Sequence, residues 1–335
     1  MIDFNITFSN INCKKYKVLA DKLIPLKDGK ILSIIYNNKV VHIYDKNFQI
    51  ITILKLKNNL SDAIQLKTKE ILLLLTGELL IYNHKTFKLL SKTKITKKYN
   101  VVPERMFELS NSNIVFCYSS SNLIEIYKKK KNNNIELIKQ ILTNYDSYSA
   151  CEINNNNIAY NCSPNYILNN YFIYFSHNDK YIKDLSLSNS RDSLYYFKEK
   201  YLIVLGFFEI YIIDLNEYKL IHKFKVENKY FYYKYKTLCL INDFLIIPGI
   251  KNKIFLLNWK ENDKNLEFVN SFNFDDSPKS PGFEEEEELN KWYFNKNDRI
   301  LFLNKKIYVY GMKGKKCKDD EYALCFDVIS KDSNK

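Results

Sequence analysis

Short apolar runs separated by polar turns recur along the chain. From Glu70, the sequence EILLLLTGELLIYNHKTFKLL contains an apolar run, a turn at Thr76-Gly77, a second apolar run and, after a polar break, a third. A similar stretch begins at Gly29, and others follow downstream. Each is preceded by a shorter apolar stretch: KLIPL, DAIQL, RMFEL, YSACEI, SLYYF, KTLCLI and KWYF. The pattern predicts repeated units of four short strands.

The ends of the third strands mark the period of the repeat. They fall 38, 45, 47, 39, 44 and 53 residues apart, at Ile43, Ile81, Ile126, Ile173, Ile212, Leu256 and Val309. The two central strands are almost wholly apolar, so we expect them to be buried on both faces. The fourth strands, such as KLLSKTKI and KLIHKFKV, alternate between apolar and polar residues and place Lys outward. Outward lysines are typical of edge strands, where they discourage pairing with another chain. A unit with two apolar faces needs a neighbour on each side.

Four-stranded units of roughly 40 to 45 residues have the period of a β-propeller blade. We therefore predict an all-β chain that forms one β-propeller domain over residues 1–335. Seven four-stranded blades fit best, and six or eight also fit the spacing. The rival fold is two smaller β domains, such as sandwiches. Helix is expected to be scarce, because no capped apolar stripe with helical spacing runs past ten residues.

A terminal strand is expected to close the ring, and the sequence offers two candidates. Ile2–Phe8 (IDFNITF) alternates strictly between apolar and other residues. Tyr322–Ile329 (YALCFDVI) is a second apolar segment that could fill the same place. We expect the N-terminal segment to supply the outer strand of the last blade.

Three third strands end in an apolar residue followed by Asp or Asn: Tyr44-Asp45, Tyr82-Asn83 and Ile213-Asp214. With the spacing and strand order, these endings resemble the WD40-type propeller family, which has Trp-Asp there, over nearly the whole chain. No unit has Trp-Asp, and none has Gly-His before its first strand, so the buried His-Asp network of that family cannot form in its usual way. The chain is similar to a diverged WD40-like propeller. The resemblance implies a non-catalytic scaffold for protein–protein interaction.

Charge suggests an alternative function. The chain has 51 Lys and Arg against 38 Asp and Glu, a net charge of +13, which could attract nucleic acid or an acidic membrane. Abundant Lys, Asn, Ile, Tyr and Phe is also what an AT-rich genome encodes, and the Phe-Arg-Arg-Gly motif of phosphoinositide-binding propellers is absent from the sequence. We expect other proteins as partners, acidic lipid or nucleic acid as the alternative, and a monomeric ring within a complex.

The sequence contains no pattern that indicates catalysis, a cofactor or a metal. GMKGKK at Gly311 lacks the spacing of a phosphate loop, and there is no GxSxG. His42, His84, His177 and His222 share no position in the repeat, and we expect no carboxylate to recur at one position. We expect no enzyme and no cofactor. An enzyme with a site in the central funnel is a third hypothesis, which requires polar residues around a pocket.

One segment breaks the repeat. Residues 275–292 (DDSPKSPGFEEEEELNKW) join the last two units, and two Ser-Pro steps precede five glutamates. We expect a mobile acidic insertion, in which phosphorylation would add negative charge. The residues expected to contact partners or regulate binding are Ser277, Ser280, Glu284, Glu285, Glu286, Glu287 and Glu288.

The cysteines, the N-terminal residues and the apolar runs indicate the cellular location of the protein. The seven cysteines are scattered without a CxxC pair, which favours reduced, mostly buried thiols. The first residues lack the basic start and apolar core of a signal peptide. The longest apolar run, YLIVLGFFEIYIIDL, is interrupted by Gly206 and Glu209 and is too short to span a bilayer. We expect a cytoplasmic or nuclear protein that is not secreted and has no transmembrane segment.

Overall fold

The fold is known from a computed structural model. It describes residues 14–18, 20, 22–35, 38–95, 103, 105–118, 122–143, 146–163, 171–176, 181–185, 193–205, 209–225, 238–248, 253–273, 293–294, 300–303, 306–313 and 321–327. Within these ranges the elements are β-strands, apart from one turn of 3-10 helix at Asn154–Asn156. The expected scarcity of helix is confirmed there, and no described helix is long and apolar enough to cross a bilayer.

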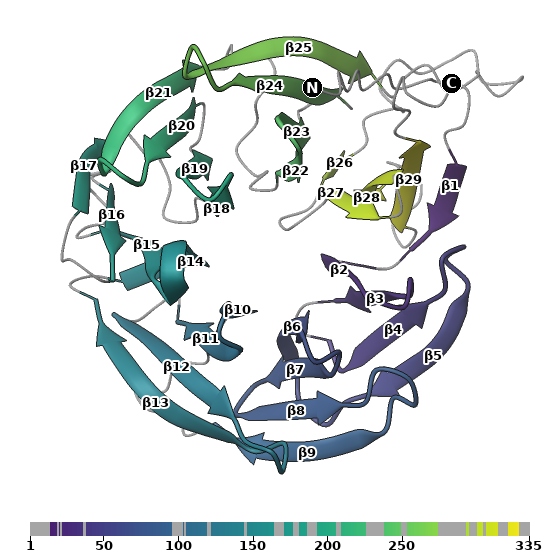
Figure 1. Cartoon of the computed structure of the whole chain (residues 1–335). Helices are drawn as coiled ribbons and strands as arrows, with labels where there is room; N and C mark the ends of the chain where they lie inside the picture. The colour runs from purple at the N-terminus through teal and green to yellow at the C-terminus, as the bar shows by residue number, and fades with distance from the viewer. Residues whose placement is uncertain are drawn as a thin grey trace, which may run out of the picture. The chain divides into compact units, whose positions relative to one another are not determined.

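In the described residues the strands form six sheets of four strands and one of five (Figure 1). The first three sheets are β2 (Lys22–Pro25), β3 (Ile31–Ile34), β4 (Val40–Tyr44) and β5 (Ile50–Lys55); β6 (Leu60–Gln65), β7 (Ile71–Leu75), β8 (Glu78–Tyr82) and β9 (Leu89–Lys94); and β10 (Arg105–Glu108), β11 (Asn113–Cys117), β12 (Leu123–Lys129) and β13 (Ile135–Leu142). The next three are β14 (Asp146–Glu152), β15 (Ile158–Ser163), β16 (Tyr171–Phe175) and β17 (Tyr181–Leu185); β18 (Ser193–Phe197), β19 (Tyr201–Leu205), β20 (Glu209–Asp214) and β21 (Lys219–Lys225); and β22 (Cys239–Ile241), β23 (Phe244–Pro248), β24 (Lys253–Lys260) and β25 (Asn265–Asn273). The five-stranded sheet has β1 (Lys14–Lys17), β26 (Tyr293–Phe294), β27 (Ile300–Leu303), β28 (Lys306–Lys313) and β29 (Glu321–Asp327).

The five-stranded sheet receives strands from both ends of the chain. β29 pairs with β28 on one side and with β1 on the other. The C-terminal candidate therefore lies beside β28, and a strand from the N-terminal part of the chain, β1, is the outermost strand of this sheet. Because β29 offers two edges, β1 can add outside it without displacing it. The segment expected to pair there, Ile2–Phe8, lies outside the described residues.

The chain divides into two compact units. One comprises residues 1–35, 41–54 and 227–335, and the other residues 36–40 and 55–226. Within the first unit, β27 contacts both β2 and β22. The second unit holds the four sheets from β6 to β21. The single domain over residues 1–335 stays a prediction.

Successive sheets of the second unit share apolar cores. One core lies between β6–β9 and β10–β13, the next between β10–β13 and β14–β17, and the third between β14–β17 and β18–β21. The third includes buried side chains of both its sheets: Ile153, Ala159, Ile173, Phe175, Leu194, Leu202, Val204, Tyr211, Ile213 and Leu215. Each inner sheet of this unit is thus covered on both faces, as the apolar central strands predicted.

Four of the seven positions that mark the sequence period coincide with β-bulges. The register between third and fourth strands shifts at Ile81/Tyr82, Ile126/Tyr127, Ile212/Ile213 and Leu256/Leu257. A bulge increases the local twist and turns the fourth strand away from the strict alternation of an ideal ladder. At these positions the repeat in the sequence therefore coincides with a repeated bulge in the backbone.

Three-residue turns join the first and second strands of several sheets. In the turn after β6, the Lys69 N–H donates to the Leu66 carbonyl at 2.8 Å, and the Leu66 N–H donates to the Glu70 carbonyl at 2.9 Å. The third turn residue takes a left-handed conformation, as such loops require. Glycine fills this position at Gly29, with φ 82°, whereas Lys69 occupies it at φ 79°.

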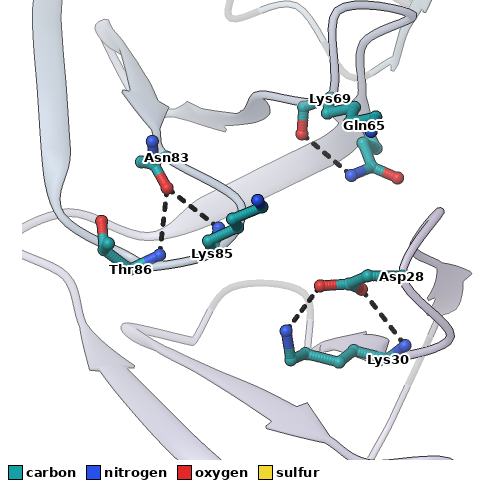
Figure 2. A network of polar contacts seen from close by, with 7 residues as sticks. All are labelled: Asp28, Lys30, Gln65, Lys69, Asn83, Lys85 and Thr86. Atoms are coloured by element: carbon teal, nitrogen blue, oxygen red, sulfur yellow. Dashed lines mark hydrogen bonds and ion pairs between the residues drawn. The ribbon is translucent and has the colours of Figure 1, made fainter.

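We expect Lys69→Gly to raise the free energy of unfolding by about 0.5 to 1 kcal/mol, since it removes left-handed strain from a residue with a Cβ. The Lys69 side chain is exposed, and the contact that fixes this turn, from Gln65 Nε2 to the Lys69 carbonyl at 2.8 Å, uses backbone alone at position 69 (Figure 2). Urea unfolding measures the change. Lys46→Gly is the control, because Lys46 is exposed and has no positive φ. Equal loss of stability in both variants would contradict the prediction.

Candidate interaction surface

The residues expected to contact partners do not lie in the described part of the chain. Ser277, Ser280 and Glu284–Glu288 all fall between the described residues 273 and 293. Their role stays a prediction. The described sheets instead present polar groups at their turns, carboxylates between strands, and apolar residues on their outer strands.

The three Asp or Asn residues that end third strands bind their own turns. Asn83 Oδ1 accepts the N–H of Lys85 at 2.9 Å and of Thr86 at 3.0 Å (Figure 2). Asp45 and Asp214 likewise accept amides two to four residues further along. These are Asx-turns, in which the side chain replaces a backbone acceptor. Where the WD40-type family has the Asp of Trp-Asp, this chain uses the residue to shape the turn to its outer strand.

Carboxylates at the ends of first strands tie neighbouring sheets together. Glu108 Oε2 accepts the N–H of Lys67 at 2.6 Å, and Glu152 Oε1 accepts the N–H of Ser110 at 2.7 Å. In each case a glutamate binds a turn amide of the preceding sheet. Bonds from a carboxylate to backbone N–H groups are among the stronger hydrogen bonds. Both glutamates have a structural role here.

Asp62 makes a second link between sheets. It lies on β6, is 1 % exposed, and accepts the N–H of Ala63 through Oδ1 and of Met106, on β10, through Oδ2, both at 2.8 Å. A buried carboxylate is tolerated when backbone donors surround it. Sequence reasoning missed this residue, although an acid at the start of the short first-strand stretch DAIQL was the available signal.

A buried glutamate collects three donors within the sheet β10–β13. Glu125 on β12 is 4 % exposed. Its Oε2 accepts the hydroxyls of Tyr118 and Tyr127, and its Oε1 accepts Gln140 Nε2 at 2.7 Å. Burial, and then the Glu125 carboxylate, raise the pKa of both tyrosines above the ordinary value. The phenols therefore stay protonated as donors.

This arrangement should make the protein sensitive to alkali. Because the pKa of Tyr118 and Tyr127 is raised on folding, their contribution to stability is present below pH 10 and lost as the pH rises above it. We expect unfolding free energy to fall by about 1 kcal/mol per tyrosine between pH 9 and 11. Urea unfolding of Tyr118→Phe should show a shallower decline than the unchanged chain. Equal slopes would contradict this.

Two further glutamates recur at one position in the repeat. Glu78 on β8 and Glu209 on β20 each stand three residues before the strand end that marks the period. Each forms an ion pair with a lysine of the fourth strand, Lys92 and Lys223 respectively. The expectation that no carboxylate recurs at one position was therefore wrong. Each carboxylate is paired within its own sheet, which indicates structural use.

The three described histidines lie on different elements. His42 lies on β4 and His222 on β21; burial lowers the pKa of both, so the neutral form is favoured. His84 lies in the turn after β8, and His177 lies outside the described residues. In the described part of the chain no three His, Cys, Asp or Glu side chains form a cluster that could hold a metal. Gly311, which begins GMKGKK, lies in β28.

Three cysteines in the described ranges are free thiols, as expected. Burial raises the pKa of Cys117 and of Cys239 to about 12, and also raises that of Cys151. Such thiols are neutral and weakly nucleophilic at ordinary pH. They contribute to packing, and Cys117 belongs to the core shared by β10–β13 and β14–β17.

Large apolar side chains are exposed on several outer strands. In the second unit, β9 exposes Leu89 and Leu90, and β13 exposes Leu137, Ile138 and Leu142. In the first unit, β5 and β25 expose Ile50, Ile51, Ile53, Phe268 and Val269. The sequence predicted outward lysines, which Lys92 and Lys94 confirm on β9, but did not predict these apolar residues. Exposed apolar groups of this kind are typical of interaction surfaces.

Comparisons with known proteins define the fold. No protein-family model matches the sequence, and no curated protein matches it. Solved structures do match: a virginiamycin B lyase from Staphylococcus aureus, at TM-score 0.62 and 10 % identity, covers 95 % of this chain and 99 % of its own. A component of the Mitotic Checkpoint Complex matches at a TM-score of 0.63 and 8 % identity, and the match covers 97 % of this chain and 93 % of that component. The dihydro-heme d1 dehydrogenase NirN matches at a TM-score of 0.59 and 10 % identity, and the match covers 92 % of this chain and 66 % of the dehydrogenase chain.

These similarities concern architecture. The lyase and the checkpoint structure are β-propellers, so this chain has an all-β, propeller-like fold. The lyase and the dehydrogenase are enzymes, so the same fold can carry catalysis. At 8 to 11 % identity the matches assign no activity. The WD40-like resemblance stands at the level of the fold.

Proposed function

We propose that this chain is a WD40-like propeller of seven blades, closed by pairing of the two chain ends, and that it acts as a non-catalytic scaffold for protein–protein interaction in the cytoplasm or nucleus. Seven sheets in the described residues and the pairing of β1 with β29 support the architecture. A rigid set of sheets that presents many turns and outer strands can hold several partners at fixed geometry.

The observation that carries the proposal is the contrast between buried and exposed groups. Buried carboxylates such as Asp62 and Glu125 have their donors within the fold. Large apolar side chains, by contrast, are exposed on outer strands, as Leu142 is at 70 %. The bonds of these two carboxylates stabilise the fold, whereas exposed apolar surface favours protein contact. Residues 275–292 are proposed as a second contact region, with Ser277 and Ser280 as regulatory positions.

Affinity purification of the tagged full chain from its native cells, followed by quantitative mass spectrometry, tests the scaffold. We expect a reproducible set of co-purifying proteins, part of which is lost when residues 275–292 are deleted. A deletion of residues 318–335, which has the same length, is unsuitable as a control because it removes β29. Scrambling the order of residues 275–292 keeps length and charge and is the better control. No specific protein above background would contradict the scaffold.

Anion binding is the second candidate, and exposed lysines favour it. Among the described residues, Lys94, Lys219 and Lys225 on outer strands form no ion pair, whereas Lys92 and Lys223 are paired with glutamates. Sedimentation with phosphatidylserine vesicles and a single-stranded oligonucleotide titration, each at low and high salt, test this candidate. Binding that falls steeply with salt supports it. Absence of binding at low salt removes it.

A further inference from the structure

The outer strand β9 and the turn before it carry positive charge and no acidic residue. Residues 83–94, called the β9 strip below, contain four lysines and no Asp or Glu. Three of these lysines are exposed and form no ion pair with a described residue: Lys85, Lys88 and Lys94. The fourth, Lys92, pairs with Glu78, a carboxylate that is 5 % exposed. The strip therefore presents positive charge to its surroundings.

The same strip exposes two large apolar side chains. Leu89 is 50 % exposed and Leu90 is 41 % exposed. The other outer strands whose side chains are described lack this combination. β21 has no large exposed apolar residue, and β5, β13 and β25, taken with the turns before them, include the acidic residues Asp45, Glu136 and Glu267 respectively. Among these strands, exposed apolar residues without an acidic neighbour are therefore found on β9.

The turn between β12 and β13 lies beside this strip. Ser91 Oγ, on β9, donates to the Asn133 carbonyl in that turn at 2.6 Å. Lys131, in the same turn, is exposed and forms no ion pair with a described residue, whereas Lys130 pairs with Glu136 at 3.0 Å. A basic turn of the next sheet therefore adjoins the β9 strip.

The chemistry of the strip fits an acidic lipid surface better than a protein strand. Lysines along an edge oppose the addition of another β-strand. A bilayer that contains acidic lipids attracts basic residues over its whole surface and needs no matching backbone. A lysine can keep its charge among the head groups while its stem and neighbouring leucines contact the apolar region below. The β9 strip contains both kinds of group.

We propose that the β9 strip binds the surface of a bilayer that contains acidic lipids. Leu89 and Leu90 insert between the head groups, and Lys85, Lys88 and Lys94 pair with the phosphate and carboxylate groups of the lipids. The proposal rests on the anion-binding candidate above, for which it names the ligand and the strand that binds it. It does not depend on the scaffold function.

Flotation of the full chain with lipid vesicles tests the proposal. Vesicles of phosphatidylcholine alone are compared with vesicles in which about a third of the lipid is phosphatidylserine, each at low and high salt. Lys88→Gln/Lys94→Gln removes two charges of the strip. Lys219→Gln/Lys225→Gln is the matched control, because these exposed lysines occupy the equivalent positions of β21.

We expect the chain to bind the acidic vesicles at low salt and not the neutral ones. Binding should weaken at least about tenfold in Lys88→Gln/Lys94→Gln and less than about twofold in the β21 control, since each lysine held near acidic lipid contributes about fivefold. Equal weakening in both variants would overturn the proposal and leave anion binding by the whole basic surface standing. Absence of binding at low salt would overturn both.

Leu90→Trp supplies a readout that does not depend on weakened binding. Its emission should shift to shorter wavelength with acidic vesicles and be quenched by brominated acyl chains, relative to the unchanged chain with its two tryptophans. Ile221→Trp, at the equivalent bulge of β21, should show neither effect. No quenching in Leu90→Trp, or equal quenching in both variants, would overturn the proposal. So would binding of a soluble acid-rich peptide to the strip without any binding to vesicles, because the strip would then bind protein.

Discussion

Replacing Glu125 by leucine is expected to lower the free energy of unfolding by about 3 kcal/mol or more, because two buried tyrosine hydroxyls and one side-chain amide lose their acceptor at once. The hydroxyls of Tyr118 and Tyr127 and the amide of Gln140 all bind this carboxylate. The site is enclosed by the core between β6–β9 and β10–β13, to which both tyrosines belong. Water cannot readily reach this site to accept the tyrosine hydroxyls in place of the carboxylate, so the loss of these hydrogen bonds destabilises the folded state.

Two matched variants separate this effect from a general loss of charge. Glu125→Gln keeps one carbonyl acceptor and should cost about 1 kcal/mol, well below the leucine variant. Glu136→Leu removes an exposed glutamate of the same sheet, half exposed and paired with Lys130, and should change stability by less than about 0.5 kcal/mol. Urea unfolding followed by far-ultraviolet circular dichroism measures all three. Equal stability of Glu125→Leu and Glu136→Leu would show that the carboxylate does not hold the tyrosines.

Much of the sheet structure could be predicted from sequence, because strand burial follows directly from composition. ILLLL at β7 and YLIVL at β19 are buried along their whole length, as apolar runs of this length indicate. The short first strands were also located, since RMFEL and YSACEI contain β10 and most of β14. The repeat can be recognised in a single sequence because the central strands of every unit must be apolar enough to be buried on both faces.

The candidate surface was harder to predict, because it depends on geometry between strands. β13 exposes large apolar residues at Leu137, Ile138 and Leu142, which a strict alternation of inward and outward positions does not predict. Glu108 and Glu152 look like ordinary polar residues until a turn of the preceding sheet is placed beside them. The order of the terminal strands could not be predicted from the apolar pattern either. Both ends of the chain contain a segment that suits the last sheet, and only the observed pairing shows that β29 lies next to β28.

Phe116→Ala tests whether neighbouring sheets depend on one another. Phe116 is fully buried on β11, in the core shared with β6–β9, and its ring lies 4.7 Å from that of Tyr127. We expect a loss of about 3 to 5 kcal/mol in unfolding free energy, since removal of a buried ring leaves a cavity. Leu90→Ala, at an exposed position of β9, is the control and should change stability by less than about 0.5 kcal/mol.

The pattern of hydrogen exchange distinguishes a shared core from independent sheets. If each sheet needs its neighbour to cover its face, amides of β7 and β8 should exchange faster in Phe116→Ala, together with those of β11 and β12. The cavity would open on both sheets, because Leu72, Leu74 and Phe116 belong to one cluster. Faster exchange confined to β10–β13 would mean that β6–β9 is stable without this contact. In that case the repeated unit would be a self-sufficient sheet, and the reason for expecting units to associate face to face would be lost.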